Sequence, residues 1–369
     1  MKILKFIFGC GLWLVLALTS CNSKDNNSSS GEDYDRKIML SNYAENVIIP
    51  NYSNLQQITE SLKKAAEIFS LNPTESNLES LRLTLFSAHV AYQSCTSFDF
   101  GPAKAVVLRS VLNTYPVNKD QIHSNITSGN YDLYTVANLA AKGFPGVEYL
   151  IYGEGLTNSE VIELYTTNSE SANRAQYLQD VVGQCQVVVK SVYEEWALNG
   201  YDQVFINSDG IAVGSSTSLF LNAMVLDFER FIRDGKIGIP LGVRSLGVPN
   251  PDKVEAYFSK KSLELVEASV EKYKDTFNGV SNTGENGQGF DDYLNHEDAS
   301  SVANNVNKQL DNILAKLALL NGPLSEDVVN NPSDVQKVYD EMQKAIVLLK
   351  VEVPSALSVL ITYQDSDGD

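Results

Sequence analysis

Histidine is scarce in this chain of 369 residues, which contains only His89, His123 and His296. No two of them lie within one helical turn, whereas a zinc peptidase site on a helix usually needs two histidines one turn apart beside a carboxylate. A Gly-x-Ser-x-Gly turn and a glycine-rich phosphate loop are also missing. These absences argue against the common zinc and serine hydrolases and against P-loop nucleotide binding, so we expect a protein that is not an enzyme.

Basic residues are few as well. The chain has 28 Lys and Arg against 46 Asp and Glu, which gives a formal net charge of −18. A surface of this sign repels nucleic acid phosphates and anionic lipid headgroups. We therefore expect no nucleic-acid partner, while cations are tolerated or attracted.

The amino-terminal segment has the pattern of a bacterial lipoprotein signal. Lys2 and Lys5 precede an apolar run over 6–18, and small residues lead to Cys21. The run is too short for a comfortable membrane span. We expect residues 1–20 to be a signal peptide and residues 21–40 to comprise the lipidated Cys21 and a flexible polar tether. Asn22 after the cysteine favours anchoring to the outer membrane of the cell envelope, on its periplasmic or its surface face.

Two other cysteines, Cys95 and Cys185, lie at core positions of expected helices. They can pair in an oxidising periplasm or remain as two buried thiols. Connectivity cannot be read from sequence, so both alternatives stay open.

Apolar residues recur at steps of three and four throughout the chain, which predicts an all-α fold. Long strand-like runs are missing. The expected helices cover 55–69, 78–92, 178–196, 215–233, 302–320 and 335–349. Ser76 and Ser333 are expected to cap two of them, and Pro354 to end the last. A chain of this length suggests two helical-bundle lobes, at 41–168 and 169–369, and both halves contain a glycine–proline turn (100–102 and 238–240) that is consistent with an internal duplication.

A short expected helix at 143–152 contains a carboxylate beside apolar residues. Pro145 suits the first turn, where a missing N–H costs nothing, and Glu148 falls where the helix dipole favours a negative charge. On these residues alone, Glu148 can be either a helix-start residue or a functional carboxylate.

Gly143 to Glu148 resembles the Gly-x-His-x-x-Glu motif of the imelysin-like family, which is named after an insulin-cleaving membrane protease, although Pro145 stands at the histidine position. Further stretches resemble family members in the same order along the chain, over roughly residues 40–369. They are Phe98-Asp99-Phe100-Gly101-Pro102-Ala103, Tyr115-Pro116-Val117, Asp234 to Gly242, and the ending Ile361 to Asp369.

The resemblance implies two packed helical bundles with a ligand site in the cleft between them, and a link to iron uptake. The implied site residues are Gly143, Pro145, Glu148, Phe100, Gly101, Glu229, Arg230 and Lys236. Glu148 is the expected metal ligand, because oxygen-rich sites suit ferric iron. The expected function is a binding lipoprotein that takes up iron, haem or another small iron-containing ligand, with other envelope uptake proteins as further partners. The alternatives are a metallopeptidase acting on envelope polypeptides and a non-catalytic adaptor.

Two acidic segments offer weaker cation sites. Asp365, Asp367 and Asp369 have the spacing that begins a calcium loop, but the chain stops before the twelfth position that completes one. His296, Glu297 and Asp298 form the one histidine–acid cluster of the sequence, without a spaced second pair of ligands.

Overall fold

A computed structural model of the chain describes residues 33–363. The expected signal peptide, Cys21 and the three aspartates of the expected calcium loop lie outside the described residues. Residues 34–363 belong to one compact unit. Within residues 33–363, no helix is long and apolar enough to cross a membrane.

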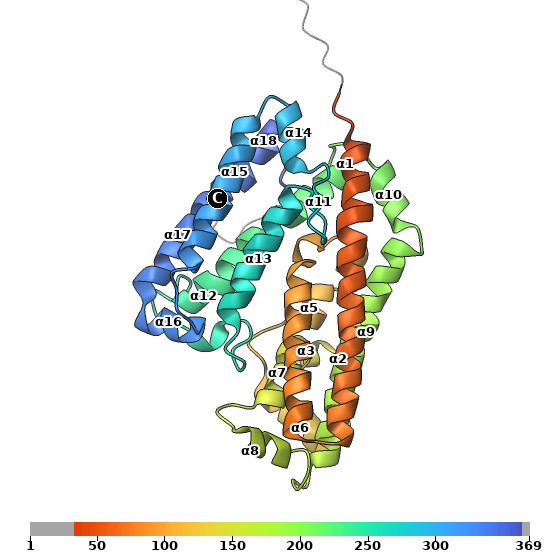
Figure 1. The fold of residues 1–369 in the computed structure, drawn as a ribbon, viewed down its shortest axis with the longest axis vertical. Helices are drawn as coiled ribbons and strands as arrows, with labels where there is room; N and C mark the ends of the chain where they lie inside the picture. Colours follow the sequence, from red (N-terminus) through yellow and green to blue (C-terminus); the bar gives the residue numbers. More distant parts are fainter. Residues whose placement is uncertain (1–32, 364–369) are drawn as a thin grey trace, which may run out of the picture. The chain divides into compact units, whose positions relative to one another are not determined.

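The predicted all-α class is confirmed, because residues 33–363 contain helices and an isolated β-bridge between Val280 and Asn286 but no strand. The α-helices are α1 (Arg36–Asn42), α2 (Ile49–Leu71), α3 (Glu75–Gln93), α4 (Gly101–Ala105), α5 (Leu108–Leu112), α6 (Lys119–Ser128), α7 (Gly143–Tyr152), α8 (Asn158–Glu163), α9 (Ser171–Ala197), α10 (Tyr201–Asn207), α11 (Ser216–Leu226), α12 (Ile239–Leu241), α13 (Ser262–Phe277), α14 (Phe290–His296), α15 (Ser300–Leu317), α16 (Leu324–Asn330), α17 (Pro332–Val347) and α18 (Val353–Ala356) (Figure 1). The π-helical segments are η1 (Tyr43–Ile48), η4 (Asp227–Gly238) and η6 (Leu348–Glu352), and the 3-10 segments are η2 (Thr96–Phe98), η3 (Val136–Ala141) and η5 (Pro251–Lys253).

Two helices begin at other residues than the expected capping residues. Thr74, not Ser76, caps α3, and its side chain accepts a hydrogen bond from the N–H of Asn77. The last long helix, α17, begins at Pro332 after Asn331, so Ser333 lies inside its first turn. In both cases the chain enters the helix two residues earlier than the capping-box pattern indicates.

Three prolines lie inside continuous helical paths. Pro50, Pro240 and Pro354 each stand at the start of an α-helix that directly follows a π-helical segment. Proline has no N–H for the bond to the fourth preceding carbonyl, and the wider π-helical turn before it accommodates this loss. The expected turn at 238–240 and the expected stop at Pro354 are therefore wrong, because the chain continues as helix.

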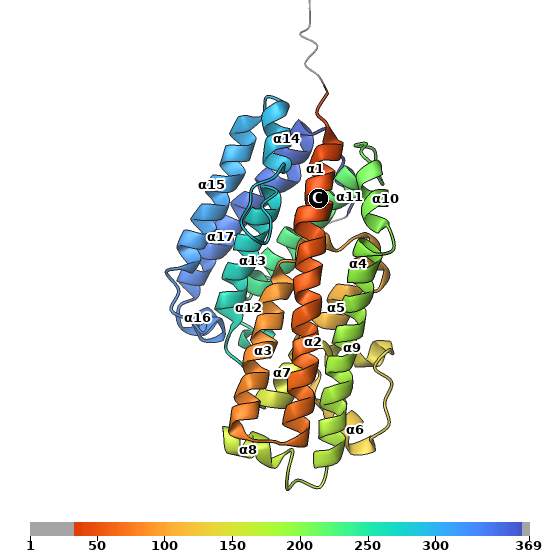
Figure 2. The same cartoon turned by 45° about the vertical axis from the view of Figure 1, so that its right-hand side comes forward.

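The long helices pack in two groups that lie side by side (Figure 2). The first group contains α2, α3, α7 and α9, and the second contains η4, α13, α15 and α17, with α3 against α13 between them. α9 follows the expected lobe boundary at residue 169, yet it packs along α2 and α7. Its stripe of apolar residues, including Leu178 and Val192, is buried there.

Two stretches of loops and short helical segments run between the groups. Residues 94–118 connect α3 to α6, and residues 242–261 connect α12 to α13. Both stretches bring polar side chains to the boundary between the groups, and these side chains form much of the candidate site.

Candidate functional site

Glu148 is positioned by a helix start that only glycine can form. Gly143 begins α7 with φ of 69°, and a Cβ there would lie 2.5 Å from the carbonyl oxygen of Leu112. Pro145 lies in the first turn, as expected, where its missing N–H breaks no helical bond. These two residues fix α7 close against α5, and Glu148 points out of α7 into the boundary between the groups.

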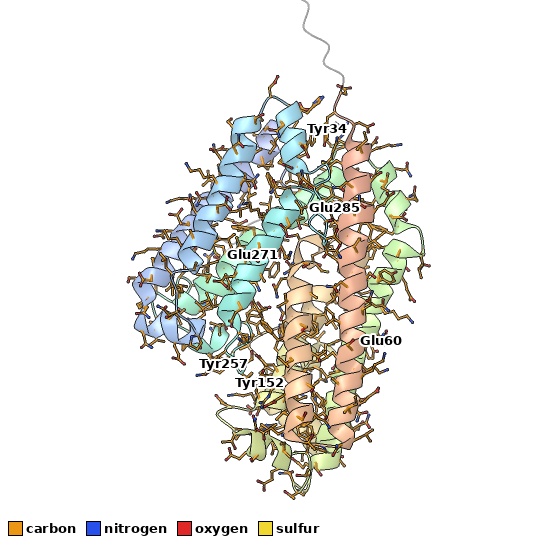
Figure 3. The ribbon with its side chains drawn as sticks, viewed as in Figure 1. Tyr34, Glu60, Tyr152, Tyr257, Glu271 and Glu285 are labelled. Atoms are coloured by element: carbon orange, nitrogen blue, oxygen red, sulfur yellow. The ribbon has the colours of Figure 1, made fainter. Side chains whose placement is uncertain are left out.

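The Glu148 carboxyl is buried, with 1% of its surface exposed. Its Oε1 accepts a hydrogen bond of 2.9 Å from the backbone N–H of Ser259, which belongs to the stretch before α13. Burial raises the pKa of Glu148 to about 7, although the hydrogen bonds from Ser259 and Phe258 act in the opposite direction. Glu148 therefore exchanges its proton close to neutral pH. Figure 3 labels Tyr152, the last residue of α7, and Tyr257, in the stretch before α13.

A pocket of about 70 Å³ lies in front of Glu148. It is lined by Tyr115, Pro116, Val117, Lys119, Pro145, Glu148, Glu154, Asp252, Val254, Ala256, Tyr257 and Phe258. Acidic side chains outnumber basic ones in this small pocket, because Lys119 is its one cation and pairs with Glu154 at 2.6 Å.

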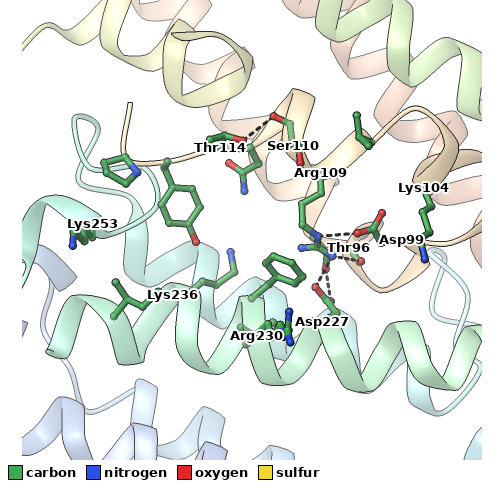
Figure 4. A pocket seen from close by; sticks show the side chains of 18 residues that line it. Thr96, Asp99, Lys104, Arg109, Ser110, Thr114, Asp227, Arg230, Lys236 and Lys253 are labelled. Atoms are coloured by element: carbon green, nitrogen blue, oxygen red, sulfur yellow. Dashed lines mark hydrogen bonds and ion pairs between the residues drawn. The ribbon is translucent and has the colours of Figure 1, made fainter. Parts of the chain in front are cut away.

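A larger pocket of about 620 Å³ shares Tyr115 and Pro116 with the small pocket. Arg109 of α5 lies along one wall, where it donates to Asp227 of η4 at 2.8 Å and to Asp99 at 3.2 Å (Figure 4). Asp227 is almost fully buried and also accepts a hydrogen bond from Thr96 at 2.8 Å. This ion pair joins the first helical group to the second.

A buried polar network lies behind the shared wall of the two pockets. Lys236 of η4 pairs with Glu255 and donates to Gln93 of α3 at 3.0 Å. Glu255 also accepts from Asn113 at 2.6 Å, and Ser269 of α13 donates to Gln93 at 2.9 Å. Burial by itself raises the pKa of Glu255, but the Lys236 charge and these hydrogen bonds outweigh it and hold this pKa below its ordinary value. Glu255 is therefore ionised.

His89 is also buried in this region, and its two ring nitrogens have no hydrogen-bond partner among the described residues. Burial lowers the pKa of His89 to about 4, although Glu255 acts in the opposite direction. The ring is neutral at pH 7 and packs against Phe144, with 5.1 Å between ring centroids. His89 is therefore a packing residue of this region.

The remaining residues implied by the resemblance lie in three places. Arg230 and Lys236 line the larger pocket. Phe100 lies in an aromatic cluster with Trp196, Phe205 and Phe220, outside the lining of both pockets, and the backbone of Gly101 lies close to Tyr201. Glu229 faces the end of the chain, where it pairs with Lys350 at 3.1 Å and accepts from Tyr363 at 2.6 Å. The structure thus brings Pro145 and Glu148 to one pocket and Arg230 and Lys236 to its neighbour.

The other candidate ligands lie apart. His123 is exposed and contacts the Tyr149 hydroxyl at 2.7 Å, while His296 is 3.6 Å from Glu297. Within residues 33–363, no three His, Cys, Asp or Glu side chains are grouped as a metal site. Cys95 and Cys185 are both free and buried, so the alternative of two buried thiols holds.

Several residues of the site carry no signal in the sequence. Glu255 and Ser259 lie in an irregular stretch without periodicity, and Asp227 looks like an ordinary helical acid. The stretches Phe98 to Ala103 and Tyr115 to Val117 do mark the wall that Asp99, Tyr115 and Pro116 form. The pair of Arg109 and Asp227 could not be predicted from local sequence patterns, because 118 positions separate the two residues.

The comparisons with known proteins agree with this architecture. The family described as Imelysin, a peptidase family by name, matches residues 48–353. A crystal structure from Parabacteroides distasonis ATCC 8503, described as an iron-regulated protein A precursor, has a TM-score of 0.74 at 16% identity over 89% of this chain and 97% of that one. An imelysin-like protein from Psychrobacter arcticum 273-4 has a TM-score of 0.70 at 18% identity, with the same coverage. No curated protein matches. On the family match, which covers most of the chain, this protein belongs to the imelysin family.

Proposed function

We propose that this protein is a lipid-anchored envelope protein that binds an iron-containing ligand in the cleft between its two helical groups. The observation that carries the proposal is the pair of adjoining pockets that meet at Tyr115 and Pro116. Clefts between packed lobes are frequent ligand sites, above all where polar groups converge. The iron assignment is supported by the family membership and by the name of the Parabacteroides neighbour, which refers to iron regulation.

The two pockets differ in charge in a way that suits a metal complex. Acidic groups, with Glu148 among them, line the small pocket, and cationic side chains line the larger one. A chelated iron ion presents positive charge at the metal and negative charge on its chelator. Glu148 can meet the metal as a carboxylate or donate a hydrogen bond to the chelator when protonated, because its pKa is about 7.

Binding is favoured over the two alternatives by particular residues. Pro145 offers no imidazole nitrogen at the position where the family motif has histidine, which weakens the metallopeptidase interpretation. An adaptor surface would be largely apolar, whereas Arg109, Lys236 and Glu148 converge on this cleft. Further envelope uptake proteins, as receivers of the ligand, remain part of the proposal.

Calorimetric titration tests the binding. The chain without residues 1–20 and with Cys21→Ser would be titrated with ferric citrate, ferrous iron, haem, zinc and calcium. We expect saturable binding of an iron-containing ligand that weakens tenfold or more, about 1.4 kcal/mol, in Glu148→Ala. Glu163→Ala removes an exposed glutamate on α8 and serves as the matched control. If none of the iron-containing ligands binds, the proposal fails, and tight zinc binding instead would favour a peptidase.

The anchor is a separate part of the proposal. Labelling cells with a palmitate analogue should modify the wild-type chain and leave Cys21→Ser unlabelled. Fractionation should place the wild type in the outer membrane and the variant among soluble envelope proteins. A chain that remains unlabelled and soluble in both forms would contradict lipid anchoring.

A further inference from the structure

The larger pocket has an unusual charge for this chain. Its lining contains the cationic residues Lys104, Arg109, Arg230, Lys236 and Lys253 but only two acids, Asp99 and Asp227. The whole chain, in contrast, has 46 acidic and 28 basic residues. A concave wall with one sign of charge concentrates the electrostatic field and attracts ions of the opposite sign. The larger pocket is thus a positive site on a negative protein.

The acids of this pocket do not cancel its cations. Asp99 and Asp227 both bind the Arg109 guanidinium, so these three groups together keep a formal charge of −1, against which the remaining lysines of the lining are set. Lys236 is paired with Glu255 behind it. Lys104 and Lys253 form no ion pair with any residue between 33 and 363, and Figure 4 shows them at opposite ends of the pocket.

The rest of the lining combines apolar side chains with a few neutral polar ones. Phe231 lies with its ring centroid 3.8 Å from the Arg109 guanidinium, and Tyr115 and Ile239 add further apolar area. Ser110 and Thr114 contribute hydroxyl groups on the α5 side. Such a wall suits a ligand with a flat or apolar body, and the cations suit negative groups at its ends.

Val107 provides an independent observation at the same pocket. It has φ of 46° and ψ of 46°, a left-handed conformation that is costly for a β-branched residue, and 56% of its surface is exposed. Backbone strain of this kind is concentrated at ligand-binding sites, where the surrounding structure enforces it. Here the strain turns the chain between α4, which carries Lys104, and α5, which carries Arg109.

We infer that the larger pocket binds a small organic anion, whose carboxylate or phosphate group contacts Lys104 or Lys253 and whose apolar body lies against Phe231 and Tyr115. This inference rests on the proposed function in treating the cleft as a ligand site, and it names the chemical class of the chelator or free anion held there. Arg230 of η4 also lines this pocket.

Iron-free probes test the inference separately from iron capture. Citrate, phthalate and pyrophosphate would be titrated into the Cys21→Ser chain lacking residues 1–20, at low and at moderate salt. Citrate and phthalate represent carboxylates without and with an apolar ring, and pyrophosphate represents phosphates. The variants are Lys104→Glu/Lys253→Glu and the matched control Lys308→Glu, which reverses an exposed lysine on α15. Spermidine serves as a cationic probe.

We expect at least one anion to bind saturably to the wild type and to Lys308→Glu, with affinity that falls as salt rises. The double variant should bind it at least tenfold more weakly, and a Lys104→Gln/Lys253→Gln variant should give an intermediate loss. No saturable binding of any of the three anions to the wild type would overturn the inference. Equal affinity of the double variant and the control would also overturn it. Neither of these negative results would decide whether iron binds at Glu148, which the separate titration with iron-containing ligands tests.

Discussion

At the scale of single residues, Glu148 makes the cleft sensitive to pH. Its pKa in the folded protein is about 7, above the ordinary value of 4.5, because burial disfavours the carboxylate. The folded state therefore binds this proton more tightly than the unfolded state does. The resulting stabilisation is complete below about pH 4.5 and is lost as the pH rises through 7.

Glu148→Gln tests this linkage. The amide carries no charge, so the variant should gain stability relative to the wild type as the pH rises from 4.5 to 8. The measurement is the difference in melting temperature between the two proteins across this range. Glu163→Gln, on the exposed face of α8, should show a constant difference. A constant difference for Glu148→Gln as well would mean that the carboxyl does not titrate near 7.

The residue scale also shows what the sequence could reveal of the site. The motif resemblance implies Glu148 and Lys236 as site residues, and both lie at the pockets. Their partners Ser259 and Glu255 come from a stretch without helical periodicity, where no pattern predicts which side chain turns inward. Such contacts depend on tertiary packing, which no local spacing encodes.

At the scale of elements, the helices could be predicted from sequence and their boundaries at prolines could not. The periodic stripes predict α2, α3, α9, α15 and α17. The sequence pattern indicates a break at Pro240 and an end at Pro354, but the π-helical segments η4 and η6 lead directly into these prolines. A proline in the sequence shows that one helical hydrogen bond is missing. A wider, π-helical turn before the proline can accommodate this loss without ending the helix.

Val107 gives a prediction for the α4–α5 connection. Glycine adopts the left-handed conformation without the steric cost that valine has there, and the exposed Val107 side chain loses few contacts. Val107→Gly should therefore raise the free energy of unfolding by about 1 kcal/mol. Urea denaturation measures it, and Val204→Gly, at an exposed position within α10, should lower stability instead. If Val107→Gly instead lowered the free energy of unfolding, the contacts of the valine side chain would stabilise the protein by more than its left-handed backbone conformation costs.

At the scale of the whole described unit, the two helical groups are joined by polar contacts as well as by apolar packing. Arg109 and Asp227, Gln93 and Lys236, and Glu148 and Ser259 all cross the boundary. Buried pairs of this kind are costly to break, because the remaining partner keeps a desolvated charge. The boundary therefore holds the cleft in a defined geometry while it exposes groups that can bind a ligand.

Asp227→Asn should weaken this boundary. In this variant Arg109 keeps its ion pair with Asp99 but loses the buried ion pair with residue Asp227. We therefore expect the free energy of unfolding to fall by about 3 kcal/mol. Asp99→Asn is the matched comparison and should cost less, because the Asp99 side chain is 27% exposed and that of Asp227 is 1% exposed. Equal effects of the two substitutions in urea denaturation would show that the Arg109–Asp227 pair has no special role.

Locating the metal in a crystal tests most directly whether an iron-containing ligand binds in the cleft. Crystals grown with ferric citrate would be measured on both sides of the iron absorption edge. We predict an anomalous peak in the small pocket beside Glu148, with density for the chelator reaching past Tyr115 into the larger pocket. Iron bound elsewhere on the chain, with both pockets free of chelator density, would contradict it.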